Sequence, residues 1–334
     1  PRVRRQRQMC IRDSNGIKYI YGFSATKEKI CEEYLFHYPK GSKAQVFKRT
    51  GQEFSFIQNK AFKQLISKAV AENQLYFSVA NTMNESVCTE AMKFFTESIV
   101  FSREFEDIPG QIRFNYNNNN VLKSMKQYAQ RADVGIIDMK FDMKNTEIDV
   151  DDTIPENAPP ELSRALKSFV SALSDNSQAK IQRNEIKART YHTGVNKKGE
   201  LGQYELSLED ESDGTHRLMA LAPAIDRVID NGGIFVADEL EKGLHPLLTE
   251  YIVNKFQNSE INKNHAQLIF TTHDTEIMRQ HFLDADQFYF VDKDRQTGES
   301  ELYSVDGLGK KSNADIRTGY LIGKFGGIPE LGDE

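Results

Sequence analysis

Two adjacent carboxylates follow a short apolar run in the segment GGIFVADELEKGLHP. The run Ile234–Ala237 predicts a buried strand, so Asp238 and Glu239 stand at its carboxyl end. In parallel α/β sheets, ligands bind at the carboxyl ends of the strands. In phosphoryl transfer, the first acid of such a pair holds hydrated Mg²⁺ and the second polarises a water molecule. The plain alternative is a pair of acids that caps a strand-to-helix loop.

A second candidate site is the segment ESDGTHRL, which stands immediately before a predicted helix. Ser212 and Thr215 carry hydroxyl groups, and Gly214 allows a close approach of another backbone. Together with the free N–H groups of a helix N-terminus, these residues can form an anion site. The alternative is an ordinary helix N-cap.

The segment LIFTTHD places His273 just past the end of the next predicted strand. An imidazole there could bond a γ-phosphate or the attacking water, although a single histidine in this position is commonly a surface residue. The three motifs occur in one order along one lobe of the chain, which favours a shared function over three separate accidents.

The elements that carry these motifs alternate between strand and helix. We expect a hairpin through Gly199, helices over 214–230, 247–257 and 275–282, strands over 234–237 and 266–273, and a final strand pair over 286–293 and 299–305. Strands that alternate with helices of this length predict βαβ units and a parallel sheet.

The first part of the chain has a different pattern. Short runs rich in Tyr, Phe, Ile and Val from Gly16 predict an antiparallel meander, and residues 61–105 have helical spacing. A helix over 121–130, a strand over 134–141, a solvated flap over 147–161 and a helix over 161–173 are expected next. The Arg-rich residues 1–13 are interpreted as a non-native or disordered leader.

The composition is that of a soluble globular protein, with 334 residues, 39 % hydrophobic residues and a net charge of −6. A net negative charge argues against a dedicated nucleic-acid coat. No apolar run approaches the roughly 20 residues that cross a bilayer. Three scattered cysteines form neither a disulfide framework nor a zinc pattern. We therefore expect a cytoplasmic protein without membrane contact.

The motifs resemble those of a known family. Residues 212–215 resemble an ABC signature, 234–239 a Walker B strand with its catalytic glutamate, 241–245 a D-loop, and His273 the switch histidine. The set is similar to SMC-like ABC ATPase heads, and most closely to bacterial AAA family ATPases of abortive-infection and restriction-linked operons. The segments GIKYIYGFSATKEKICEEYLF and GYLIGKFGGIPEL are also similar, so the resemblance covers most of residues 14–331.

The resemblance implies an α/β fold. This is an ABC-type P-loop ATPase head, with a parallel or mixed sheet and flanking helices, together with an antiparallel β-subdomain and a helical insertion. The expected boundaries are the leader at 1–13, the remainder of an N-terminal β lobe at 14–60, a mainly helical insertion at 61–178, and a C-terminal ATPase lobe at 179–334.

The resemblance also implies a function in anti-phage defence. ATP and Mg²⁺ are the expected cofactors, with Asp238 at the Mg²⁺ through water and Glu239 and His273 catalytic. Ser212, Gly214 and Thr215 would contact nucleotide across a homodimer with ATP between its heads. Hydrolysis would control a partner effector, expected to be a nuclease, whereas nucleic-acid binding has no support in the sequence. The alternative is a non-hydrolysing scaffold or sensor; intact Glu239 and His273 favour the enzyme.

One family element is missing from the printed sequence, because no segment reads G-x-x-x-x-G-K-[ST]. The segment SVDGLGKKS imitates a phosphate loop but has Ser304 and Lys311 at defining positions. Asp292-Lys293-Asp294 imitates a nuclease metal motif and is interpreted as a hairpin turn. In the family the loop precedes the meander, so we expect it before Gly16 and expect this chain alone to bind ATP weakly and to be inactive.

Overall fold

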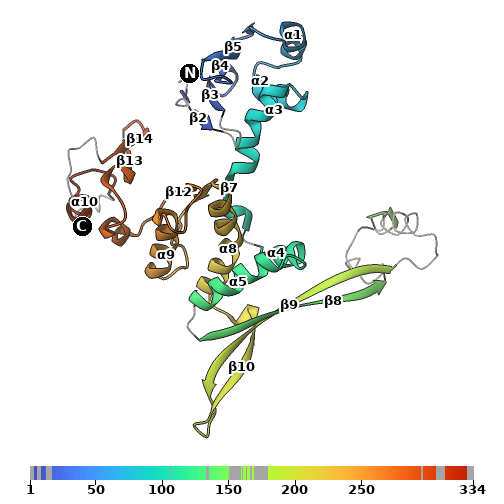
Figure 1. The fold of residues 1–334 in the computed structure, drawn as a ribbon, viewed down its shortest axis with the longest axis vertical. Coiled ribbons are helices and arrows are strands. Elements are labelled where there is room, and N and C mark those ends of the chain that lie inside the picture. Colours follow the sequence, from blue (N-terminus) through green and yellow to red (C-terminus); the bar gives the residue numbers. More distant parts are fainter. Residues whose placement is uncertain are drawn as a thin grey trace. The chain divides into compact units, whose positions relative to one another are not determined.

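The computed structural model describes residues 4–5, 9–12, 17–105, 107–132, 135–149, 159, 161–162, 164–165, 168, 180–294, 296–305 and 313–328. The chain divides into two compact units, residues 1–100 and 101–334, and each is described by itself. Both mix helices with strands, so the chain has a mixed α/β fold with several sheets (Figure 1).

Unit 1 is built on an antiparallel meander, as the sequence predicts. Its consecutive strands are β3 (Lys18–Ala25), β4 (Ile30–His37), β5 (Ala44–Thr50) and β6 (Glu53–Ser55). Two short strands, β1 (Arg4–Arg5) and β2 (Met9–Arg12), also pair with β3. Both short strands lie within the expected leader at residues 1–13.

Helices cover the meander within the same unit. They are α1 (Lys60–Lys68), α2 (Tyr76–Thr82), α3 (Ser86–Lys93) and the π-helical turn η1 (Phe94–Ser98). Leu35 and Phe47 of the strands share one buried cluster with Ile66, Tyr76 and Ala91 of the helices. The unit boundary after Val100 therefore differs from the predicted one after residue 60, because the first helices bury their apolar faces on the meander.

Unit 2 begins with helices and a long strand ribbon. Its first elements are β7 (Ile99–Phe101), which spans the unit boundary, the 3₁₀ turn η2 (Ser102–Phe105), α4 (Ile108–Asn115) and α5 (Asn119–Ala132). They lead to β8 (Ile136–Asp149), which pairs with β9 (Lys180–Val195) (Figure 1). The hairpin from β9 to β10 (Leu201–Ser207) through Gly199 is confirmed, with the glycine at a positive φ of 81°.

The ribbon is longer than the sequence predicts. Because β9 offers partners as far as Lys180, β8 continues past residue 141 to Asp149 and includes the start of the expected flap. Most of the remaining flap and most of the helix expected at 161–173 lie outside the described residues.

The predicted βαβ unit is confirmed in unit 2. After the short 3₁₀ turn η3 (Leu208–Asp210) come α8 (Asp213–Asn231), β11 (Ile234–Ala237), α9 (Pro246–Gln257) and β12 (Gln267–Phe270). Strands β11 and β12 are parallel, with Ala237 opposite Phe270. A partly buried carboxylate, Asp226, ties three helices together because it accepts from Ser124 and Tyr128 of α5 and from Lys255 of α9.

The chain beyond β12 departs from one expectation. The helix predicted at 275–282 is a short 3₁₀ turn, η4 (Thr275–Arg279), because the Gln280 N–H bonds back to Ile277 and no α-helical ladder follows. A second short turn, η5 (Ala285–Gln287), precedes the antiparallel pair β13 (Tyr289–Lys293) and β14 (Ser300–Ser304) and helix α10 (Asn313–Leu321). Asp294 accepts the Gly298 N–H within the connecting turn, which confirms the hairpin interpretation of the Asp-Lys-Asp motif. Residues 306–312, which carry most of the phosphate-loop imitation, lie outside the described part.

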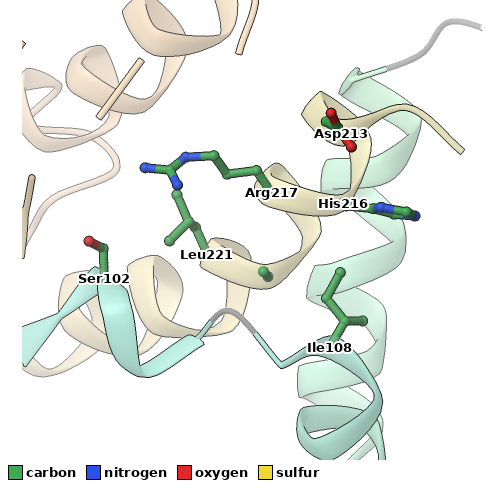
Figure 2. A pocket seen from close by; sticks show the side chains of 7 residues that line it. Ser102, Ile108, Asp213, His216, Arg217 and Leu221 are labelled. Carbon is green, nitrogen blue, oxygen red and sulfur yellow. The ribbon is translucent and has the colours of Figure 1, made fainter. Parts of the chain in front are cut away.

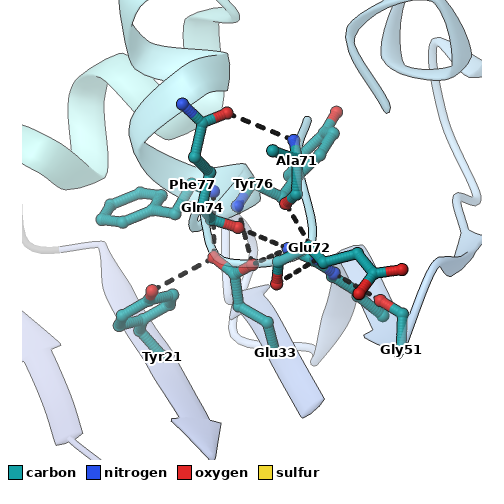
Figure 3. A network of polar contacts seen from close by, with 9 residues as sticks. Tyr21, Glu33, Gly51, Ala71, Glu72, Gln74, Tyr76 and Phe77 are labelled. Atoms are coloured by element: carbon teal, nitrogen blue, oxygen red, sulfur yellow. Dashed lines mark hydrogen bonds and ion pairs between the residues drawn. The ribbon is translucent and has the colours of Figure 1, made fainter. Parts of the chain in front are cut away.

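A network around a buried ion pair connects the start of α2 and the segment before it to the sheet of unit 1 (Figure 3). The Glu33 carboxylate lies 3.6 Å from the Arg49 guanidinium, and both side chains are fully buried. Glu33 accepts the backbone N–H groups of Tyr76 and Phe77, at 2.7 and 2.9 Å, and the hydroxyl of Tyr21. Arg49 donates to the carbonyl of Gln74 and to three others. Burial raises the pKa of the Glu33 carboxyl, and the hydrogen bonds that Glu33 accepts from Phe77, Tyr76 and Tyr21 oppose that rise.

We expect Glu33→Ala to destabilise the protein by about 3–5 kcal/mol, because it leaves a buried guanidinium without its counter-charge and two helix N–H groups without an acceptor. The control is Glu32→Ala, since Glu32 is exposed on the other face of the same strand and should change stability by at most about 0.5 kcal/mol. Urea denaturation followed by tyrosine fluorescence measures both. Equal midpoints for the two variants would show that the network does not stabilise the fold.

Candidate functional site

The ends of β11 and β12 bring the predicted catalytic residues together. Asp238 and Glu239 follow β11, and residues 271–273 follow β12; parallel strands place both segments at one edge of the sheet. The Nε2 atom of His273 lies 3.7 Å from Oε1 of Glu239. Both side chains are open to solvent, with 85 % of His273 and 48 % of Glu239 exposed. The pair can therefore reach a ligand at this edge.

The hydroxyl of Thr271 connects the two acids. Its oxygen accepts the N–H of Glu239 at 2.8 Å and lies 2.7 Å from Oδ1 of Asp238. Because an ionised carboxylate can only accept a hydrogen bond, the Thr271 hydroxyl donates its proton to Asp238. The backbone of Thr271 also donates to Ala237 and accepts from Leu240. Sequence reasoning missed this residue, although it stands two positions before His273.

The surroundings of Asp238 favour its ionised form. The hydrogen bond from Thr271 lowers the pKa of the Asp238 carboxyl, and the Arg103 guanidinium contributes to the same shift. Arg103 lies 3.1 Å from Oδ2 of Asp238, and its side chain is largely exposed. Exposed ion pairs of this kind are weak, so an incoming cation can displace the arginine. Nothing in the sequence indicated Arg103, which is 135 residues from Asp238.

Glu239 has an unusual backbone. Its φ of 48° lies in the left-handed region, which costs a side-chain-bearing residue about 1–3 kcal/mol. Two side chains hold this conformation, since Thr271 accepts the Glu239 N–H and Arg217 donates to the Glu239 carbonyl at 3.0 Å. Arg217 is in α8, within the ESDGTHRL segment, so the signature-like helix contacts the acid pair directly.

The start of α8 confirms the helix-cap interpretation of Ser212. Its Oγ accepts the Thr215 N–H at 3.1 Å and lies 2.9 Å from the Thr215 hydroxyl. Gly214 packs on the loop after β11, because a Cβ at this position would lie 2.7 Å from the carbonyl oxygen of Gly243. The two segments that resemble a signature and a D-loop are therefore in contact. An anion site at this helix start stays a prediction.

A shallow pocket of about 170 Å³ lies beside the first turns of α8. Figure 2 shows Arg217 and Leu221 extending toward Ser102, while His216 points to the other side of the helix. Pockets for drug-sized ligands have volumes of roughly 300–1,000 Å³. This pocket is therefore too small to hold a nucleotide, and it is lined by neither acid of the candidate site.

The residues present fit a magnesium ion that is bound mainly through other ligands. Among the described residues, no group of three or more His, Cys, Asp or Glu side chains could hold a metal. Mg²⁺ in phosphoryl-transfer sites is bound by one or two carboxylates together with substrate phosphates and water. Asp238, ionised and exposed at the strand end, suits that role.

Comparison with known proteins identifies a family. A family model described as "AAA domain, putative AbiEii toxin, Type IV TA system" matches residues 11–279. No curated protein matches the chain. In the described part of the chain, no helix has both the length and the apolar character needed to span a bilayer.

We expect Thr271→Val to raise the pKa of Asp238, because valine keeps the shape of threonine but removes the donor that lowers this pKa most. As the pH falls, Asp238 of the variant should take up a proton before Asp238 of the unmodified protein. Thr271→Ser keeps the hydroxyl and should restore the lower pKa. Carboxyl ¹³C NMR titration measures the shift, and identical titrations for the valine and serine variants would contradict the role of the hydroxyl.

We expect Gly214→Ala to destabilise unit 2 by about 1–3 kcal/mol, because the new methyl group meets a backbone carbonyl. Gly202→Ala is the matched control, since a Cβ there has no neighbour within 4 Å. Thermal unfolding compares them. Equal melting temperatures would mean that the loop after β11 moves freely away from α8.

Proposed function

The chain belongs to this family of AAA domains, an ATPase family of the abortive-infection type, and from this we propose that Asp238 and Glu239 serve ATP hydrolysis. AAA domains bind ATP with Mg²⁺. The observation that carries the proposal is the single hydroxyl of Thr271, which fixes both acids at a strand end beside His273. A pair of acids that only capped the strand-to-helix loop would not require an imidazole at the same edge of the sheet.

The three side chains have separate roles in this proposal. Asp238 holds the hydration shell of Mg²⁺, which supplies positive charge to the phosphates when bound. Glu239 accepts a proton from the attacking water, in the manner of a general base. His273 donates to a phosphate oxygen or to that water. The exposure of all three side chains to solvent supports these roles, because each can reach a ligand without rearrangement of the core.

We propose that Ser212, Gly214 and Thr215 act on the nucleotide of a second copy of the chain. The hydroxyl and the N–H of Thr215 both bond to the Ser212 hydroxyl, and Thr215 is buried. The N–H of Gly214, ahead of it in the first helical turn, is therefore a group that would meet a phosphate. Two copies facing each other would then hold ATP between them. In the toxin or abortive-infection context of the family, hydrolysis would control a partner effector, for which a nuclease is our proposal.

We expect Glu239→Gln to lower ATP turnover by a factor of about 10² to 10⁴, because glutamine keeps the shape but cannot act as a base. Nucleotide binding should survive, and the variant should accumulate as an ATP-bound dimer. Asp238→Asn should instead weaken Mg²⁺-dependent binding as well as turnover. Because the printed sequence contains no phosphate loop, the assay uses a version of the protein that carries one ahead of Gly16.

The matched control for this assay is Glu260→Gln, since Glu260 is exposed after α9 and should leave turnover unchanged. Turnover is measured together with light-scattering mass, with and without ATP. Wild-type turnover by Glu239→Gln would remove Glu239 as the base and favour a capping pair. Nucleotide-dependent dimers without turnover in the unmodified protein would favour the scaffold or sensor alternative.

A further inference from the structure

Glu241 joins the loop after β11 to the segment after β12. Its Oε1 accepts the backbone N–H of His273 at 2.7 Å. In this bond the loop after β11 supplies the side chain and the segment after β12 supplies the backbone N–H. In the bond of Thr271 the roles are exchanged, because the Thr271 side chain accepts the backbone N–H of Glu239. Two side chains, one from each segment, therefore hold the two segments together on either side of the acid pair.

The Glu241 carboxylate is suited to a strong hydrogen bond. Burial raises the pKa of the Glu241 carboxyl. The hydrogen bonds from the His273 N–H and the Thr272 hydroxyl lower it by more, so that the pKa lies below its ordinary value. Its second oxygen, Oε2, is buried without a hydrogen-bond partner. The bond that Oε1 accepts from the His273 N–H is therefore a hydrogen bond to a charged, partly buried acceptor. Charge-assisted hydrogen bonds are roughly twice as strong as neutral ones.

The side chain of His273 has little else to fix its position. Its imidazole is 85 % exposed, and its contact with Glu239 is long, at 3.7 Å. The place of such a side chain depends on the backbone from which it projects. We propose that Glu241 is a positioning residue that sets the distance between the His273 imidazole and the Glu239 carboxylate. The inference rests on the proposed function, in which these two groups act on the same water or phosphate.

The loop itself does not depend on the Glu241 side chain. Leu240 is fully buried and Leu244 is nearly so, and these two residues anchor the loop. Two backbone bonds close its turns, from Lys242 to Glu239 and from Leu244 to Glu241. Removal of the carboxylate should therefore leave the loop folded while it releases the His273 backbone.

The test uses the whole chain without nucleotide. In the unmodified protein we expect an NMR Overhauser effect between the His273 ring and the Glu239 side chain. Glu241→Ala should abolish this effect and accelerate exchange of the His273 amide by about tenfold or more, the equivalent of one charge-assisted hydrogen bond. Glu241→Gln keeps an acceptor oxygen and should retain the effect with intermediate exchange. Glu260→Gln should match the unmodified protein.

Exchange of the Leu240 amide reports whether the loop stays folded, and it should be the same in all variants. An Overhauser effect that persists in Glu241→Ala would overturn the proposal. The proposal is supported when the Overhauser effect is absent in Glu241→Ala and present in Glu241→Gln, while exchange of the Leu240 amide stays slow in both variants. Absence of the effect in Glu241→Gln as well would show that the carboxylate shapes the loop generally, and this too would overturn a positioning role. Since no readout involves ATP, a failure of ATP turnover would count against the proposed function alone.

Discussion

The hydroxyl of Thr271, held between two parallel strand ends, is the interaction on which the arrangement of the site depends. It can reach both Asp238 and the Glu239 backbone only because β11 and β12 run in register, with Ala237 opposite Phe270. A slip by one residue would turn every side chain to the other face of the sheet. The buried residues of β11, Phe235 and Ala237, therefore contribute to the site through this register, although neither supplies one of its polar side chains.

The same acid pair is tied to α8, and α8 is tied to the strand ribbon. Arg217 bonds to the Glu239 carbonyl, and Gly214 packs against Gly243. Just before the helix, the buried Glu211 carboxylate lies 2.7 Å from Nε2 of His192 in β9. The base of the ribbon, the start of α8 and the Glu239 backbone are therefore linked by side-chain contacts. The contacts form one continuous chain within unit 2.

The sequence could predict what depends on local pattern. Apolar runs and turn residues indicated the meander, the hairpin through Gly199 and the parallel βαβ unit, and motif spacing brought Glu239 and His273 to one edge. It could not predict Arg103, because a contact across 135 residues leaves no spacing signal. The grouping of α1–α3 with the meander depends on which apolar faces meet, and the short turn at Thr275 depends on hydrogen bonds that periodicity does not encode.

The two units use charge in opposite ways, and the contrast bears on where nucleotide would act. Glu33 and Arg49 are buried and surrounded by donors and acceptors, so they stabilise a fold. The pair Glu239 and His273 is exposed and sparsely bonded. Opposite charges 4 Å apart attract by only about 1 kcal/mol in bulk water but by about 4 kcal/mol at an effective dielectric constant of 20. An open site of this kind gains its electrostatic strength when another surface excludes water. That is a physical reason to place the proposed nucleotide between two copies of the chain, since a second copy would supply both the signature residues and the cover.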